Sequence, residues 1–344
     1  MSRIGSLARV LGYGVVGFLL SSSVAAQVAA TDKDVPIEVR LNPDKKTLMI
    51  GEPLFVAFEV TNLSGEKLCL DIRGDYPNKL GRPESFDVRV SRDDGVELPK
   101  IRATGLAGSF GCDPIEPGET YKVRFLLPHW VTIERPGSYR VKVRRDMDFS
   151  IYDGSDSREP KYSMFAEVET QLTVVPADEN KMGGVINAFG SIMLDASDSR
   201  ALDSAMALAS MEDKRVISYF AEALGRFGNS GFSVGRDKEF MISSRSITAL
   251  ARYDDDQAIA ALRAAMKSTS DDIRLLVAKA LSDCPHRSAI TLLMKMQNDS
   301  YYFVRLRVAK GLENVETKEA LATLQKLLKD ESKDVREAAQ ESLN

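Results

Sequence analysis

Residues 304–312, VRLRVAKGL, belong to a set of four related segments. The others are 242–250 (ISSRSITAL), 273–281 (IRLLVAKAL) and 335–343 (VREAAQESL), so each segment begins thirty-one residues after the previous one. An arginine follows the first residue in three of them, every segment ends in leucine, and the residue before that leucine is small. A fixed period of this length is typical of a solenoid that is built from one repeated unit of secondary structure.

Each repeat divides into two predicted helices. In the third interval, residues 288–296 predict the first helix and residues 304–312 predict the second. Along the second helix, Val304, Val308 and Leu312 recur at four-residue steps, which gives one buried stripe. A single pair of helices cannot cover this stripe, so neighbouring pairs must stack. The predicted fold class of this part is an all-α solenoid.

Asp299, followed by Arg305 and Leu312, forms a pattern that resembles HEAT-type repeats, including the variant found in phycobilin lyases. The pattern returns thirty-one residues later, and the resemblance covers residues 198–344. It implies that the aspartate caps the approach to the second helix and that the arginine bridges adjacent repeats. No lyase activity is implied, because many binding proteins share this repeat. The arginines expected to be structural in this way are Arg274, Arg305 and Arg336.

An earlier repeat is predicted from residues 201–209 and 216–224, which fit the template with a broken spacing. Residues 225–240 contain four glycines and three phenylalanines, and they do not suit a first helix. Loops inserted in repeats project from one face and often bind, so Phe232 is a candidate partner-binding residue. Packing inside a helix-poor repeat is the alternative. The segment 177–197 is expected to be a linker or a capping helix.

Positions that face away from the buried stripe form ladders across the predicted stack. The basic residues on these ladders are candidates for partner binding: Arg245, Lys279, Arg307 and Lys310. If second helices line the inner curve, as the resemblance implies, then Lys279, Arg307 and Lys310 form a basic patch that suits an acidic peptide, protein or anionic polymer. Tyr301, Tyr302 and Phe303 add aromatic side chains in a nearby turn, a composition that is enriched in interfaces. An ordinary solvated helix face is the alternative.

The chain before residue 177 has a different pattern. Residues 37–41 alternate apolar and polar side chains, as in a half-buried strand. Turn residues, such as those at 93–95 and 116–118, separate this segment from further strands. The later predicted strands are 54–60, 68–72, 86–90, 121–127, 139–143 and 168–174. Seven short strands predict a β-sandwich over residues 35–176.

Two segments of this region resemble bacterial immunoglobulin-like domains. In residues 136–143 a Pro-Gly turn leads a tyrosine into a strand, as in the late strand of such domains, and residues 51–62 resemble an early strand. The resemblance implies an immunoglobulin-like sandwich and no particular activity.

Residues 1–26 have the three parts of a secretory signal. Arg3 and Arg9 are positive, residues 10–20 are apolar, and small residues lead to Ala26. The apolar core is well short of the ~20 residues that span a bilayer, which favours cleavage after Ala26 over an uncleaved anchor. We therefore expect a periplasmic or secreted protein with no stable membrane insertion.

Cys69 lies in a predicted strand and Cys112 in a glycine-rich loop. In an exported protein the two are expected to form a disulfide. Closing a loop of this length stabilises a protein by roughly 3–4 kcal/mol in the chain-entropy view. The alternative is that Cys69 is a small buried apolar side chain.

Bulk composition narrows the function. The 344 residues are 44% hydrophobic and 28% charged, which suits two or three folded domains. A net charge of -4, with acids and bases interspersed, gives no pull toward nucleic acid. With two histidines and no nucleophile–base pair, zinc pattern or nucleotide loop, no catalytic residue, metal site or cofactor is predicted. Residues 153–157 offer oxygen ligands but lack EF-hand spacing, so a solvated loop is expected there.

The predicted function is an exported, non-catalytic scaffold that binds a protein or peptide. The alternative is an inhibitor or regulator of a secreted enzyme, acting through the β-sandwich, whose strand pattern loosely resembles that of bacterial proteinase-inhibitor-like domains. An enzyme with carboxylate chemistry between the domains is the third option, and no spacing of acidic residues favours it.

Overall fold

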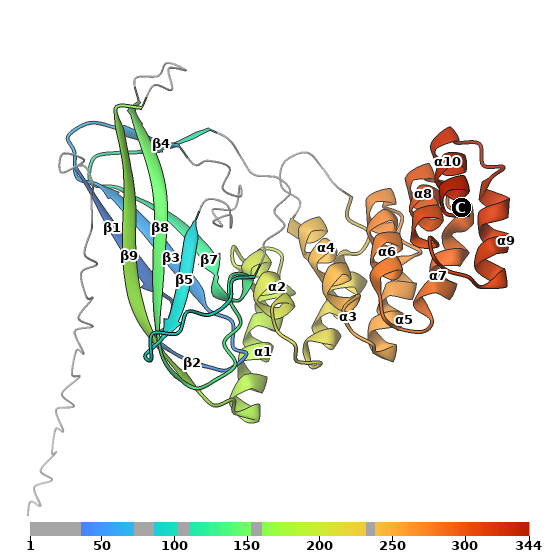
Figure 1. The fold of residues 1–344 in the computed structure, drawn as a ribbon, viewed down its shortest axis with the longest axis horizontal. Helices are drawn as coiled ribbons and strands as arrows, with labels where there is room; N and C mark the ends of the chain where they lie inside the picture. The colour runs from blue at the N-terminus through green and yellow to red at the C-terminus, as the bar shows by residue number, and fades with distance from the viewer. Residues whose placement is uncertain (1–35, 72–85, 102–110, 153–159, 232–237, 344) are drawn as a thin grey trace, which may run out of the picture.

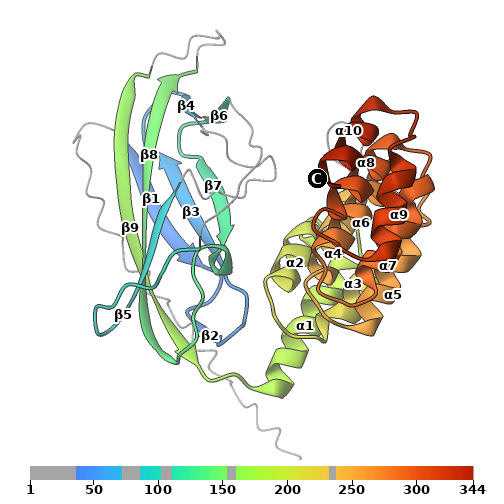
Figure 2. The same cartoon turned by 45° about the vertical axis from the view of Figure 1, so that its right-hand side comes forward.

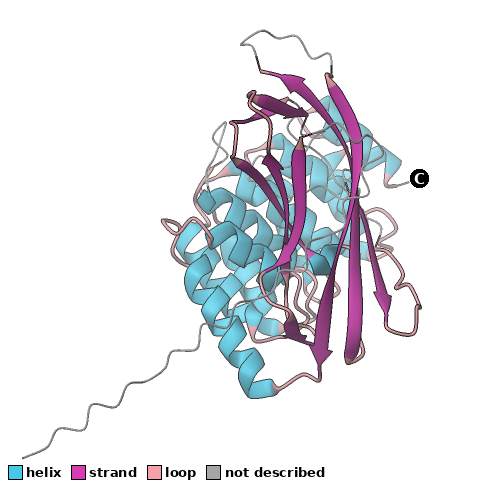
Figure 3. Cartoon of the chain, turned by 90° about the vertical axis from the view of Figure 1, so that its left-hand side faces the viewer, coloured by secondary structure: helices cyan, strands magenta, loops and turns pink. Residues whose placement is uncertain are grey.

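The computed structural model describes residues 36–71, 86–101, 111–152, 160–231 and 238–343, which form a β region followed by a row of helices (Figure 1). Seen from the β region, the strands lie in front and the helices behind (Figure 3). The prediction of a mainly β part followed by an all-α part is confirmed. None of the helices in these ranges is both long and apolar enough to cross a membrane.

The described part of the β region contains nine strands. They are β1 (Ile37–Pro43), β2 (Thr47–Met49), β3 (Phe55–Asn62), β4 (Leu68–Asp71), β5 (Asp87–Arg92), β6 (Cys112–Ile115), β7 (Thr120–Leu126), β8 (Gly137–Ile151) and β9 (Tyr162–Val175). Strands occur at all seven predicted positions. Alternation alone did not predict β2, which has 3 residues, or β6, which contains Asp113 and Pro114, residue types that are depleted in strands.

The strands form two sheets. One has the order β1-β3-β7, and the other has the order β2-β9-β8-β4-β6, with β5 also paired to β8. Only β2, among the described pairings, runs parallel to its neighbour. Phe58 and Val123 from the first sheet share one buried cluster with Val141 and Phe149 from the second. The two sheets therefore pack face to face around a single apolar core.

Ten α-helices follow in the described residues. They are α1 (Glu179–Met193), α2 (Ala201–Ala209), α3 (Val216–Phe227), α4 (Lys238–Leu250), α5 (Asp256–Ala265), α6 (Asp271–Asp283), α7 (Ala289–Lys295), α8 (Tyr302–Gly311), α9 (Lys318–Leu327) and α10 (Lys333–Glu341). The predicted pairs of the regular repeats correspond to α5–α10. Helix α1 occupies the segment that was expected to be a linker or cap, and its Met182 and Ile186 join the buried cluster of the stack.

The pairing of the early helices corrects one prediction. Helix α2 packs against α1 and α4, while α3 packs against α4 and α5. The row α2, α4, α6, α8, α10 is continuous, so these are the second helices of five repeats. Grouping residues 201–209 with 216–224 as one repeat was therefore wrong, because α2 ends one repeat and α3 begins the next.

Glycine explains why α1 was not recognised as a repeat helix. Gly190 lies against the ring of Tyr219 on α3, and a Cβ atom there would approach the ring to 2.2 Å. The Tyr219 hydroxyl also donates to Asn187 Oδ1 of α1 at 2.9 Å. The glycine that lowers helix propensity thus permits the close contact between α1 and α3.

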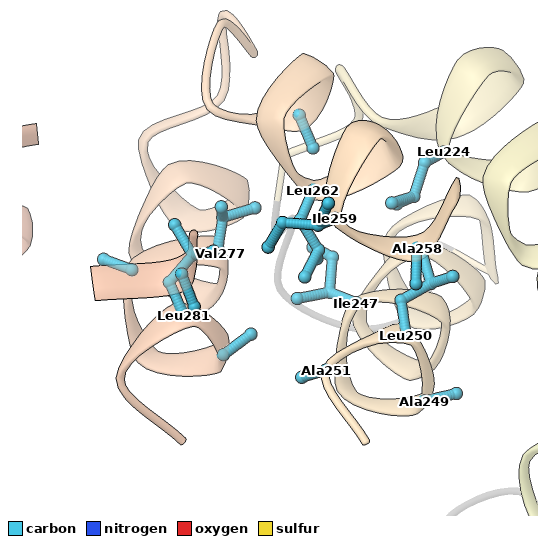
Figure 4. Packing of buried hydrophobic residues seen from close by; sticks show 14 of the residues in the cluster. Leu224, Ile247, Ala249, Leu250, Ala251, Ala258, Ile259, Leu262, Val277 and Leu281 are labelled. Carbon is cyan, nitrogen blue, oxygen red and sulfur yellow. The ribbon is translucent and has the colours of Figure 1, made fainter. Parts of the chain in front are cut away.

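The core of the stack consists of the apolar residues that recur at the same position of each repeat. Ile247, Ile259 and Leu262 lie between helices, with Val277 and Leu281 across from them (Figure 4). Burying each large side chain contributes about 1.5–3 kcal/mol. The residue before the last leucine of the segment 304–312 must be small, because a Cβ on Gly311 would lie 2.7 Å from Leu293 Cδ2.

Candidate interaction surface

Arg274 and Arg305 bridge adjacent repeats, as the resemblance implied. Arg336, in the last repeat, instead donates to the carbonyl oxygens of Asp330 and Glu331 in its own repeat, at 2.6 and 2.9 Å. Arg274 donates from Nε to Asp299 Oδ2 at 2.8 Å and from Nη2 to Oδ1 at 2.9 Å. Arg305 pairs with Asp330 in the same way, at 2.8 and 3.0 Å. Each aspartate belongs to the next repeat, and bidentate pairs of this kind are both strong and directional. These arginine–aspartate bridges lock α6 to the repeat of α8, and α8 to the repeat of α10.

The aspartates also hold the turns that begin the second helices. Asp299 Oδ1 accepts from the Tyr301 amide at 2.9 Å, and Asp330 Oδ1 accepts from the Ser332 amide at the same distance. Burial raises the pKa of Asp299, but hydrogen bonds from Arg274 and the Tyr301 amide outweigh this effect. The net pKa lies below the ordinary value of 3.8, so the carboxylate stays charged when bridged.

Other basic side chains of α6 and α8 lie on the side of these helices that faces solvent. Lys279 on α6 and Lys310 on α8 are exposed, and Arg307 is partly exposed. Helices α6 and α8 are neighbours, so the structure brings these three cations to one side of the stack. Among the described side chains, no acid forms an ion pair with any of the three. Helix α10 instead exposes Glu337 and Glu341, which limits the positive charge to α6 and α8.

Arg245 continues this side of the stack on α4, close to the β region. Burial, together with the charge of Arg245, lowers the pKa of His129 to about 4. His129 ends η2 (Leu127–His129), the short helix after β7. Arg245 therefore lies near the junction of the two regions and not at the centre of the basic cluster.

The aromatic residues before α8 form a compact group. Ring centroids lie 4.0 Å apart for Tyr302 and Phe303, and 5.2 Å apart for Tyr301 and Phe303. Tyr301 and Tyr302 pack partly against the core, whereas Phe303 is 38% exposed. Phe303 thus offers more apolar surface than either tyrosine. We call Arg245, Lys279, Phe303, Arg307 and Lys310 together the second-helix face.

The β region packs against α2, the first of the second helices. Arg124 of β7 donates to Asp203 Oδ2 at 2.7 Å and to Asp44 Oδ2 at 2.9 Å. Its guanidinium also lies 4.4 Å from the ring centroid of Phe55. Burial raises the pKa of Asp203, and the charge of Arg124 offsets this only in part.

An apolar contact surrounds this ion pair. Phe55 and Leu126 from the β region bury themselves against Met206 and Ala207 of α2, with Phe189 of α1 beside them. Sequence motifs did not predict this contact. A signal was present in the run 125–127, Phe-Leu-Leu, because successive apolar residues in a strand indicate that both of its faces are covered.

Cys69 and Cys112 are brought together on the neighbouring strands β4 and β6, where the structure joins them by a disulfide. Their Cα atoms lie 5.4 Å apart, which is within the range that a disulfide spans. Cys284 is a partly buried free thiol, and burial raises its pKa. Phe232, residues 153–157 and the signal segment 1–26 lie outside the described residues.

No group of three or more potential metal ligands occurs in the part of the chain that the structure describes. His286, in the turn before α7, is fully used in a structural contact. Its Nδ1 accepts from the Ser288 amide at 3.1 Å, and its Nε2 faces Asp256 Oδ1 at 3.1 Å. Since Nδ1 is an acceptor, Nε2 carries the proton and donates to the carboxylate.

Comparison with known proteins agrees with this architecture for the later helices. The family model for HEAT repeats matches residues 235–306 and 292–344. No protein in a curated collection matches the sequence.

Three solved structures give distant likenesses. Human deoxyhypusine hydroxylase in complex with glycerol is 17% identical, with a TM-score of 0.29, over 47% of this chain and 73% of that chain. An engineered protein is 19% identical, with a TM-score of 0.32, over 47% and 79%. A PapD-like domain of human CEP192 is 13% identical, with a TM-score of 0.23, over 51% and 100%. Such values carry no argument about function. What is shown is that residues 235–344, a range that includes α4–α10, match HEAT repeats.

Proposed function

We propose that this chain is a non-catalytic scaffold that binds a protein partner on the second-helix face. HEAT repeats commonly act as platforms for protein interaction, and their shape supplies binding surface without chemistry of its own. The arginines of the internal bridges keep the repeats in register. The residues that carry binding are those on the open side of the same helices.

The observation that carries this proposal is the docking of the β region on α2. That contact uses a second helix, and α4, α6 and α8 continue the same row on the side toward the β region (Figure 2). The row therefore already packs against another folded region of the chain at its first repeat. Phe303, with 38% of its surface exposed, offers an apolar anchor farther along the row.

Charge supports an acidic partner. Lys279, Arg307 and Lys310 have no acidic partner among the described side chains, and a cluster of one sign raises the rate at which an oppositely charged protein associates. Binding on this face should therefore weaken as ionic strength rises, because salt screens exposed charges beyond about 8–10 Å.

The remaining parts of the proposal concern the β region and the compartment. We propose an immunoglobulin-like sandwich, supported by two face-to-face sheets and by the Tyr139 hydroxyl, which donates to the Arg135 carbonyl at 2.7 Å. We also propose export through residues 1–26, which the Cys69–Cys112 pair supports because disulfides persist in oxidising compartments. Fractionation of the source cell, followed by mass spectrometry of the N-terminus and of the disulfide-linked peptides, tests both export and pairing.

The binding proposal is tested by capture and cross-linking with the intact chain. The variant Arg307→Glu/Lys310→Glu should lose most of the captured partner, whereas Lys329→Glu, an exposed charge reversal just after α9, should retain it. Equal capture by both variants would exclude the second-helix face as the binding surface. Capture that survives these changes but is lost in Arg140→Glu/Arg144→Glu, on the exposed side of β8, would support the alternative of an inhibitor or regulator acting through the β region.

A further inference from the structure

A groove with a volume of about 400 Å³ lies between α5 and α7. These are first helices, so the groove lies on the other row of the stack from the second-helix face. Its main lining consists of Arg263, Met266, Lys267, Leu292, Lys295 and Met296. Nothing in the proposed function uses these residues.

The rim of the groove is positively charged. Arg263, Lys267 and Lys295 are exposed, and none of them forms an ion pair with any acid among the described residues. The one acid in the lining, Asp299, is already occupied, because both of its carboxylate oxygens accept from Arg274. The groove therefore presents three uncompensated cations.

Comparison with the next repeat shows that the groove lacks a hydrogen-bond acceptor. One repeat later, Lys326 of α9 donates to Asn298 Oδ1 at 2.6 Å. Thirty-one residues earlier, the two positions are Lys295 and Lys267. A lysine ammonium has donors and no acceptor, so this pair cannot form the bond that Lys326 and Asn298 make. A carboxylate placed between Lys267 and Lys295 would supply the acceptor with two charge-assisted hydrogen bonds.

The base of the groove is apolar. Met266 is partly exposed, and Leu292 and Met296, which also line the groove, are buried. Methionine side chains are flexible and polarisable, so they adapt to the shape of an apolar group. A bare inorganic anion would leave this base uncovered, whereas a peptide could place an apolar side chain on it.

We propose that the groove between α5 and α7 is a second docking site, which binds an acidic peptide segment with a carboxylate between Lys267 and Lys295 and an apolar side chain over Met266. It does not depend on the second-helix face.

The site is tested by fluorescence anisotropy with the intact chain and two labelled peptides. The first peptide has eight residues with glutamates flanking two leucines, and the second has serines in place of the leucines. The first should bind, and the second should bind more weakly. Reversing either lysine, in Lys267→Glu or Lys295→Glu, should weaken the first peptide by about tenfold or more at low salt. Thermal unfolding of each variant checks that it remains folded.

Two further variants separate this groove from the second-helix face and from a general effect of charge. Lys267→Asn restores the acceptor of the repeat, so it should let residue 295 bond internally, lower peptide affinity and leave or raise the thermal midpoint. Arg307→Glu should leave peptide affinity unchanged, and Lys295→Glu should leave partner capture on the second-helix face unchanged. Unchanged affinity in Lys267→Glu and Lys295→Glu, equal binding of the serine peptide, or no binding of the leucine peptide by the wild type would each overturn the proposal.

Discussion

Helices α5–α10 and helices α1–α4 are built from the same kind of helix pair, but different contacts hold them together. Arg274–Asp299 and Arg305–Asp330 bridge successive repeats of the later part. One repeat earlier, the corresponding positions are Ser243 and Ser268. Both partners of the bridge are thus replaced at the junction of α4 with the repeat of α6.

The paired replacement has a physical reason. Removing only one member of a buried ion pair leaves an uncompensated charge, which is far more costly than replacing both. The α4–α6 junction relies instead on apolar packing and on Asn229, whose Oδ1 accepts from the Thr269 amide at 3.1 Å. Farther toward the N-terminus, Arg124 and the apolar cluster tie α2 to the β region. The junction between α4 and α6 therefore lacks the ion-pair bridge that holds the two later junctions.

The largest expected effect comes from breaking a bridge. Arg305→Met leaves Asp330 nearly buried, with 8% of its side chain exposed, and without its partner. Denaturant unfolding should show a loss of about 3–5 kcal/mol. The folded pKa of Asp330 lies below 3.8, so its stabilisation is present above that pH and is lost as pH falls through the folded pKa. The variant should lack this acid-dependent step. A loss below about 1 kcal/mol would show that the bridge is only a surface pair.

The opposite end of the stack should respond to loss of its ion pair. Arg124→Met removes the partner of the half-buried Asp203 and the contact with Phe55. Because the Arg124 side chain is 28% exposed, the expected loss is smaller, about 1–3 kcal/mol. Burial already raises the folded pKa of Asp203, so the carboxyl costs stability as pH rises through the range between its unfolded and folded pKa. The difference between variant and wild type should therefore shrink on acidification, and a difference that grows would contradict this assignment.

A pH effect on stability is also expected near α4. Burial and Arg245 hold the folded pKa of His129 at about 4, below its ordinary value of 6.5. The stabilisation is complete above pH 6.5 and is lost as pH falls toward 4, because the unfolded chain binds the proton more readily. We expect about 3 kcal/mol of pH-dependent stability over this window, and His129→Gln should remove it. If the stability of the wild type and of His129→Gln depended on pH in the same way, His129 would not be the source of this pH dependence.

The smallest effect is expected at the junction without a bridge. Ser243 is buried, and its Oγ has no hydrogen-bond partner among the described residues. Ser243→Ala removes an unsatisfied hydroxyl, so thermal unfolding should show a change within about 1 kcal/mol, in either direction. A loss as large as that of Arg305→Met would mean that this junction holds the stack as firmly as the bridges do.

The sequence predicts α5–α10 well because a strict period aligns every column. It predicts α1 and the early pairing poorly, since Gly190 lowers helix propensity and the spacing before α4 is irregular. The contact of Arg124 with Asp203 joins residues 79 apart in the chain, and no local pattern encodes it. The register placed Tyr301, Tyr302 and Phe303 near the basic side chains, but which ring faces solvent depends on where α8 begins.

Hydrogen exchange in the native state tests most directly whether the bridges create the difference between the two parts. The Ser270 and Tyr301 amides occupy the same position in successive repeats. Ser270 donates to Ser268 Oγ at 3.0 Å, and Tyr301 donates to Asp299 Oδ1 of a bridge at 2.9 Å. If the bridges lock the later repeats, the Tyr301 amide should exchange about tenfold or more slowly than that of Ser270, after correction for intrinsic rates. Equal protection, or slower exchange at Ser270, would contradict a locking role for the bridges.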